Sequence, residues 1–451
     1  MTTQPVESLI ARLAVPTIVS MLVTALYNMA DTYFVGLLDN TSATGAVGVV
    51  FSFMAIIQAC GFFFGQGSGN YVSRLLGQER AADAERIAAI GFFSALLVGF
   101  AIQIFGMIFL EPLARLLGST ETILPYAKQY LRIILFGAPY MTSSLVLNNL
   151  MRFQGNAFYS MLGIGSGAVL NVALDPLFIF TFGMGVAGAA LATAISQFIG
   201  FSVLLFCCTR GDNIHIRPQA FKPHFADYKV IINGGLPSLC RQGLSSLATI
   251  CLNRMAGAFG ADAAIAAMSV ATRIMGFAFS AVIGFGQGFQ PVCGFNFGAG
   301  LYSRVKKSYF FCIKVGTAIL LVLSAAGVIF ARSLVGLFST DAEVIRIGIL
   351  SLRLQCYAFP LTATITMSNM LFQNIGKVGR ASFLAIARQG IFFIPLVVGL
   401  PYLLPPLFGA VPLLGVQLAQ PLADVISFII AIPLAKGVVS SFGADAPQEM
   451  K

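Results

Sequence analysis

Long apolar runs recur along this chain and constrain its fold more than any other feature. They follow one another from about residue 10 to residue 436, and each exceeds the ~20 residues that a helix needs to cross a hydrocarbon core of about 30 Å. Charged residues make up only 10% of the 451 residues, whereas soluble domains carry about 25%. We therefore predict an all-α polytopic membrane protein. The first run is too long for a cleavable signal peptide and carries an acid, so none is expected.

Twelve transmembrane helices are predicted from these runs. The predicted spans lie near residues 10–38, 44–72, 87–110, 125–150, 158–182, 186–208, 231–258, 263–297, 309–331, 344–373, 382–405 and 411–436. Several are longer than a simple crossing requires, which indicates tilted or kinked helices, or ends that reach into water.

An internal repeat divides the spans into two pseudo-symmetric six-helix bundles. Pairs at a constant offset of 221 in the numbering include Pro16 with Pro237, Gly65-Gln66-Gly67 with Gly286-Gln287-Gly288, Asn148 with Asn369 and Gly155 with Gly376. We assign an N-lobe to residues 1–208, a linker to 209–229, a C-lobe to 230–438 and a tail to 439–451. Both lobes hold an even number of spans and so enter and leave the membrane on the same side, which suits alternating access.

The loop charges predict the orientation in a cell membrane. Loops after even-numbered spans hold most of the basic loop residues: Arg74, Arg80, Arg86, Arg152, Arg210, Arg217, Lys222, Lys229, Arg304, Lys306, Lys307, Lys377 and Arg380. Because Lys and Arg accumulate on the cytoplasmic side, these loops, the linker and both termini are predicted to be cytoplasmic. The net charge of +10 is thus explained by topology, and no binding of nucleic acid is expected.

Asp31, Asp175 and Asp424 are the acids that fall within predicted spans. A carboxylate there costs roughly 2.5–3.5 kcal/mol on insertion scales, so each is a candidate for function. Asp31, Asp175 and Thr193 each lie eight residues from the outer end of their span, or about 12 Å at 1.5 Å per residue. Asn171 lies one turn from Asp175 on the same face.

These side chains, together with the Val172 carbonyl that Pro176 leaves without its helical N–H, supply only oxygen ligands. Such a set suits a proton or a small hard cation. In the second repeat, Asp31 is replaced by Leu252, and Asp175 by Ile394 or Leu396. The difference favours a task confined to the N-lobe over a purely structural bond from each acid to a neighbouring helix.

The role of Asp424 is left open between packing and function. For Arg388 and Gln389, in the eleventh span, interhelical bonding and a place in a substrate cavity both remain open.

Several motifs together resemble the multidrug and toxic compound extrusion (MATE) transporters. They are Tyr27-Asn28-x-x-Asp31-x-x-Phe34-Val35-Gly36, Asn171-x-x-Leu174-Asp175-Pro176-x-Phe178-Ile179-Phe180, Gly188-Ala189-Ala190-x-Ala192-Thr193 and the Gly-Gln-Gly turns. The resemblance implies a twelve-helix antiporter, without a cofactor, that exports small lipophilic cations or amphiphiles in exchange for H+ or Na+. It also implies an N-lobe cation site at Asp31, Asn171, Asp175 and Thr193, with Tyr27 and Asn148 nearby.

One branch of that family carries further acids in its C-lobe, but spans 7, 8, 10 and 11 hold none here. A C-lobe sodium site is therefore not expected. We expect a transporter rather than an enzyme, working as a monomer in the lipid bilayer.

Three other classes of membrane protein place polar residues within the bilayer. An intramembrane aspartyl protease needs carboxylates close enough to share a proton, and neither acid lies in a Gly-x-Gly-Asp motif. A channel is expected to repeat its filter residues, and no such repeat is visible. A lipid-linked precursor flippase of similar architecture stays the alternative, because intramembrane arginines could bind phosphate: Arg132, Arg241, Arg254, Arg273, Arg353 and Arg388.

The predicted topology can be tested by cysteine labelling. In a variant without the native cysteines, a cysteine at Gln219 in the linker should resist an impermeant thiol reagent added outside intact cells. A cysteine in the loop between residues 110 and 125, predicted to lie outside, should react. Labelling of a cysteine at position Gln219 under the same conditions would contradict the predicted orientation.

Overall fold

The computed structural model describes residues 1–38, 41–209, 214–409 and 411–443. Within them, eleven helices are long and apolar enough to cross a membrane. One of these, α8 (Phe225–Gly298), consists of two helices that meet at Ala261, where φ is 52° and ψ is −156°. The described chain therefore holds twelve candidate spans, which confirms the predicted fold class. Arg210 of the predicted linker and residues 444–451 of the predicted tail lie outside the described residues.

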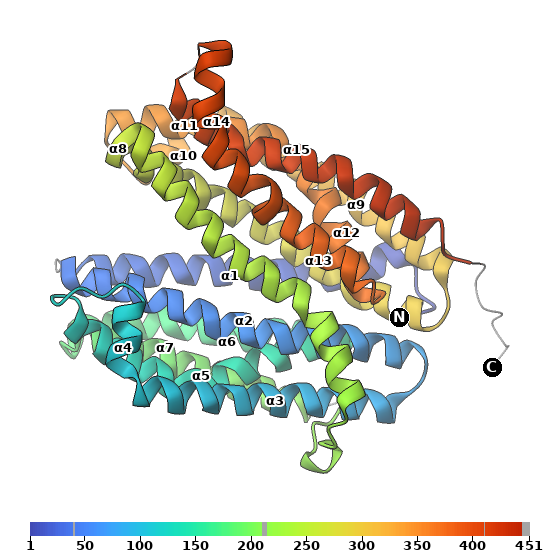
Figure 1. Cartoon of the computed structure of the whole chain (residues 1–451). Helices are drawn as coiled ribbons and strands as arrows, with labels where there is room; N and C mark the ends of the chain where they lie inside the picture. Colours follow the sequence, from blue (N-terminus) through green and yellow to red (C-terminus); the bar gives the residue numbers. More distant parts are fainter. Residues whose placement is uncertain (39–40, 210–213, 410, 444–451) are drawn as a thin grey trace. The chain divides into compact units, whose positions relative to one another are not determined.

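The first of two compact units comprises residues 1–2 and 11–239. Its helices are α1 (Val6–Gly36), α2 (Thr41–Gly77), α3 (Ala81–Ile108), α4 (Leu110–Leu116), α5 (Leu124–Phe153), α6 (Ala157–Pro176) and α7 (Gly185–Cys208), with a π-helical turn η1 (Leu177–Thr181) and a 3-10 turn η2 (Pro218–Ala220). Helix α5 is central, since it contacts α2, α3, α4, α6 and α7 (Figure 1). This unit is called unit 1 below.

Glycines let these helices approach closely. A Cβ on Gly99 of α3 would lie 2.5 Å from the Cα of Pro139 in α5, and a Cβ on Gly65 of α2 would lie 2.7 Å from the Asn149 amide. Small residues at such crossings maximise van der Waals contact between helices where no hydrophobic effect drives them together.

The second unit, unit 2, comprises residues 3–10 and 240–451. After α8 its helices are α9 (Tyr302–Ile329), α10 (Ala331–Gly336), α11 (Ala342–Ala358), α12 (Thr362–Asn374), α13 (Val378–Ile386), α14 (Ile394–Phe408) and α15 (Pro412–Val439). A 3-10 turn η3 (Phe359–Leu361) joins α11 to α12, and a π-helical segment η4 (Ala387–Phe393) joins α13 to α14. Helix α15 contacts α11, α12, α14 and η4.

The sequence repeat is also a repeat of individual contacts. The amide nitrogen of Asn148 donates to the Ser160 carbonyl at 3.1 Å, and that of Asn369 donates to the Ala381 carbonyl at 2.7 Å. Donor and acceptor are both displaced by the repeat offset of 221. Each bond ties a helix to the one that follows it, so the same structural solution occurs in both units.

Gly155 and Gly376 terminate equivalent helices. Their φ angles are 93° and 77°, in the left-handed region where glycine has no steric penalty. In both units the backbone N–H after the glycine bonds back to a carbonyl of the last turn, as Asn156 does to Met151 at 2.9 Å. This is the Schellman pattern of helix termination, and it explains why glycine recurs at this offset.

The helices extend further than the apolar runs that predicted them. Helix α3 begins at Ala81 rather than near 87, and α9 begins at Tyr302 rather than near 309. Hydropathy marks only the part of a helix inside the hydrocarbon, whereas backbone hydrogen bonding continues into the polar ends. The connection predicted between 258 and 263 is a kink at Ala261 instead of a loop.

Candidate cation site

Asp175 lies where helix α6 changes geometry. The α-helical part ends at Pro176, and the π-helical turn η1 follows at once. Proline cannot donate a backbone hydrogen bond, and π-turns are rare features that recur at functional sites. The Asp175 side chain is completely buried. Neither of its carboxylate oxygens has a hydrogen-bond partner among the described residues.

Asn171 and Thr193 meet beside this carboxylate. The Asn171 Nδ2 donates to the Thr193 Oγ1 at 3.3 Å, and both side chains are buried. The amide oxygen of Asn171 is therefore turned away from Thr193, and within the described chain it has no donor. One turn separates Asn171 from Asp175 on α6, so an unused amide oxygen and a carboxylate lie along the same face.

Asp31 and Tyr27 reach the site from helix α1. They are also one turn apart, and both Asp31 and Asp175 interact electrostatically with the Tyr27 hydroxyl and with each other. The Asp31 Oδ1 is buried and has no hydrogen-bond partner among the described residues. The structure thus brings together the four residues predicted to bind a cation, and Tyr27 with them.

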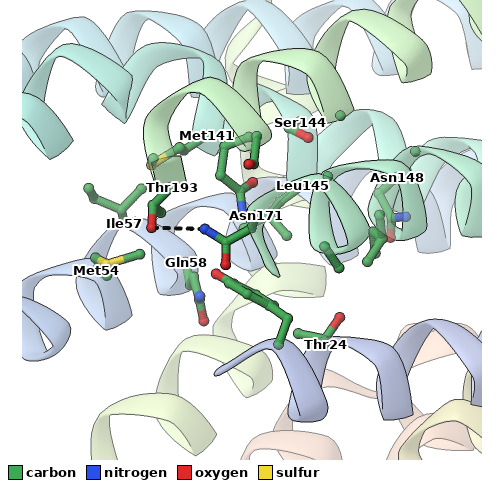
Figure 2. Close-up of a pocket in the computed structure, with 18 of the residues that line it drawn as sticks. Thr24, Met54, Ile57, Gln58, Met141, Ser144, Leu145, Asn148, Asn171 and Thr193 are labelled. Carbon is green, nitrogen blue, oxygen red and sulfur yellow. Dashed lines mark hydrogen bonds between the residues drawn. The ribbon is translucent and has the colours of Figure 1, made fainter. Parts of the chain in front are cut away.

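A cavity of about 110 Å³ opens next to these residues inside unit 1, with room for several water molecules. Tyr27, Asn171 and Thr193 line it, whereas Asp31 and Asp175 are not among its lining residues. Figure 2 shows Asn171 at the middle of the cavity, with Thr193 beside it and Asn148 at the opposite end. Asn148 is therefore a cavity residue, although its amide nitrogen is also engaged by Ser160.

Three polar residues of the site were missed in the sequence. Tyr130 of α5 is buried and its side chain lies near Thr193. Gln197 lies near Tyr27, and the buried Ser196 Oγ has no partner in the described chain. Ser196 and Gln197 follow Thr193 at the i+3 and i+4 positions, so a search for a polar helix face would have found them. Tyr130 lies between Gln129 and Arg132 of α5, so a polar residue at this point does not by itself single out the cation site.

The arrangement can bind a proton or a hard cation. An ionised carboxylate without compensation costs several kcal/mol in a protein interior, and two lie here with an amide oxygen and hydroxyls around them. A bound cation or a proton offsets that cost. The ligand atoms are all oxygens, which hard cations prefer, and the carboxylates can also take up a proton.

Arg388 and Gln389 belong to unit 2 and are not part of this cluster. The Arg388 Nε donates to the Asp424 Oδ1 at 2.6 Å, and the Gln420 Nε2 donates to the same oxygen at 2.9 Å. Asp424 differs from Asp175 in this respect, because its charge is compensated within the protein.

A family model described as MatE matches the chain twice, at residues 16–177 and 237–398. The starts of the two matches differ by the same repeat offset, and together the matches cover more than half of the chain. Multidrug export protein MepA of Staphylococcus haemolyticus is 27% identical over 397 residues, which are 88% of this chain and 86% of the relative.

Solved structures agree over almost the entire length. A MATE protein in complex with MaL6 superimposes with a TM-score of 0.91 at 27% identity, and 97% of each chain is covered. A multidrug resistance MATE family transporter in an outward-facing conformation gives 0.91 at 26% identity, also with 97% of each chain covered.

The unpartnered oxygens of Asp175 predict a stability effect of unusual sign. Asp175→Asn removes a buried charge that receives no donor, and it should stabilise the purified protein by about 1–3 kcal/mol. Thermal unfolding in detergent, at alkaline pH and without sodium, measures the change. Asp424→Asn is the matched control: it leaves the Arg388 guanidinium without its counter-ion and should destabilise by about 3–5 kcal/mol. Equal losses of stability in Asp175→Asn and Asp424→Asn would mean that the Asp175 carboxylate is also stabilised by partners within the protein.

Proposed function

The chain belongs to the MatE family of multidrug efflux transporters, and we propose that it exports lipophilic cations and amphiphiles in exchange for H+ or Na+ by alternating access. The observation that carries the proposal is a cluster of buried side-chain oxygens in unit 1 that have no hydrogen-bond donor in the described chain. They belong to Asp31, Asn171 and Asp175. A transporter needs such a site, because an ion can drive a cycle only if its binding changes the free energy of a conformation.

The proposed coupling is electrostatic. Binding of H+ or Na+ at Asp31 and Asp175 neutralises the buried carboxylates, and the conformation that releases the drug outward becomes favoured. Inward movement of one elementary charge through 100 mV provides about 2.3 kcal/mol, equal to a roughly fifty-fold drug gradient. Tyr27, Asn171 and Thr193 line the cavity and belong to the same polar cluster as the two acids. We therefore propose that they link occupancy of the ion site to the cavity.

The cavity lining supports a cationic or neutral cargo over an anionic one. Met21, Met54, Met141 and Phe62 contribute soft apolar surface, and no Lys or Arg stands among the described residues that line it. Methionine side chains adapt to ligands of different shape. A lipid-linked precursor carries phosphate and needs basic groups, so the flippase alternative is not favoured.

We further propose that the protein acts as a monomer in the cell membrane, with both termini cytoplasmic. The orientation rests on the Lys and Arg bias of the loops.

Transport in proteoliposomes tests the function directly. Efflux of a lipophilic cationic dye should follow an imposed proton or sodium gradient, and the gradient that drives it identifies the ion. Asp31→Asn and Asp175→Asn should abolish gradient-driven efflux, because each removes a carboxylate with nearly the same shape. Asp262→Asn, an exposed acid of α8, is the matched control and should transport at the wild-type rate.

Two results would contradict the proposal. Wild-type rates in both Asp31→Asn and Asp175→Asn would exclude the N-lobe site. The protein can also be expressed in a pump-deficient host. If the host's sensitivity to cationic dyes and biocides did not change, the proposed substrate class would be wrong and the flippase alternative would be favoured.

A further inference from the structure

Arg388 and Asp424 form a buried ion pair in unit 2. Besides the 2.6 Å bond from Nε, the Arg388 Nη2 donates to Asp424 Oδ2 at 3.4 Å. The Asp424 side chain is 5% exposed and that of Arg388 19%. The guanidinium carbon also lies 5.0 Å from the ring centroid of Phe279, a favourable position for a cation. The carboxylate is thus enclosed, whereas the Arg388 side chain is partly exposed.

The repeat shows which residues of unit 1 correspond to this cluster. Arg388 lies seven residues after Ala381, and Gly167 lies seven residues after Ser160. Ser160 and Ala381 accept the equivalent asparagine bonds of the two units, so Arg388 corresponds to Gly167. Gly167 lines the cavity of unit 1.

Phe279 has its counterpart in the same cavity. At the offset of 221 it corresponds to Gln58, which lines the cavity beside Asn171 (Figure 2). The register of these helices is confirmed by two close contacts. A Cβ on Gly65 would meet Asn149, and a Cβ on Gly286 would meet Met370, again with both partners displaced by this offset.

Asp424 can be placed by a third contact. A Cβ on Gly188 of α7 would lie 2.7 Å from backbone atoms of Phe178, and a Cβ on Gly415 of α15 would lie 2.5 Å from the Pro401 nitrogen. Both glycines mark where the last helix of the unit touches the backbone of the preceding one. Gly415 follows Gly188 by 227 positions, so six more residues precede the last helix of unit 2 than the offset of 221 provides. Asp424 lies nine residues after Gly415, as Gln197 lies nine residues after Gly188.

Gln197 lines the cavity of unit 1 as well. All three residues of the unit 2 cluster therefore correspond to cavity residues of unit 1: Arg388 to Gly167, Phe279 to Gln58 and Asp424 to Gln197. Gly167 packs closely against α7, where an added Cβ would lie 3.0 Å from the Ser196 carbonyl oxygen. Unit 2 carries an arginine side chain at the equivalent position.

We propose that unit 2 contains a second carboxylate cation site, whose permanent ligand is the guanidinium of Arg388. Asp424 is the anion of this site. The Gln420 amide donates to its carboxylate, and the Phe279 ring lies against the cation. Because the cation is covalently part of the chain, the site cannot release it during a cycle. It follows that only unit 1 exchanges a coupling ion, a conclusion that rests on the proposed antiport. Truncation of Arg388 should then open a site for a free small planar cation.

Chemical rescue with guanidinium chloride tests the site. At about 10 mM the salt is far below the molar range in which it denatures proteins. Arg388→Ala should unfold at a lower temperature than the wild type, and guanidinium should raise its apparent Tm by at least about 2 °C, as a ligand that binds only the folded state does. The wild type should not respond, since its site is filled.

Two controls separate rescue from a general salt effect. Tetramethylammonium carries the same charge without N–H donors and should not rescue Arg388→Ala. The double variant Arg388→Ala/Asp424→Asn should not respond to guanidinium, because the anion is absent. An equal response in the double variant, or no response in Arg388→Ala, would overturn the proposal.

A second pair of variants keeps the proposal testable if Arg388→Ala does not fold. Removal of both charges in Arg388→Met/Asp424→Leu should restore folded protein, because apolar groups of similar volume can replace a buried ion pair. Recovery no better than in Arg388→Met alone would mean that Arg388 has other essential partners. These measurements report the stability of the protein. They can therefore contradict the proposed site in unit 2 whether or not the transport assay supports the proposed antiport.

Discussion

A carboxylate buried between helices needs a donor, a cation or a proton to offset the free energy of leaving water, and the two repeats meet this requirement differently. In unit 1, the oxygens of Asp175 and the Oδ1 of Asp31 receive no hydrogen bond within the described chain. In unit 2, Asp424 receives bonds from Arg388 and Gln420. The arrangement in unit 1 is suited to a cation or proton that binds and dissociates. The arrangement in unit 2 keeps the carboxylate charge neutralised permanently.

The scaffold around both sites is shared, and glycines and helix breaks determine it. The Schellman turns at Gly155 and Gly376 end equivalent helices, and the equivalent asparagines of the two repeats tie them to the helices that follow. π-helical segments lie next to Asp175 in unit 1 and include Arg388 in unit 2. One backbone plan therefore carries a cavity in unit 1 and an ion pair in unit 2, and only a few side chains decide between them.

Much of this could be predicted from sequence because it depends on simple periodicity. The helical rise placed Asp31, Asp175 and Thr193 at one depth, and the i+4 spacing placed Asn171 beside Asp175. The helix ends were predicted less well, since hydropathy does not register polar turns such as Ala81–Arg86 of α3. The pairing of Arg388 with Asp424 could not be predicted. It joins residues 36 positions apart through a π-helical segment that leaves no mark in hydropathy.

The central claim is that binding of the coupling ion to unit 1 weakens binding of the drug, and the reverse. Measurements of equilibrium binding test this claim most directly. The affinity of the purified protein for a lipophilic cationic drug should be measured over a range of pH and of sodium concentration. Because coupling between two ligands is reciprocal, drug affinity should fall as the coupling ion saturates its site, and Asp175→Asn should remove that dependence. Drug affinity that is independent of both pH and sodium in the wild type would contradict the account.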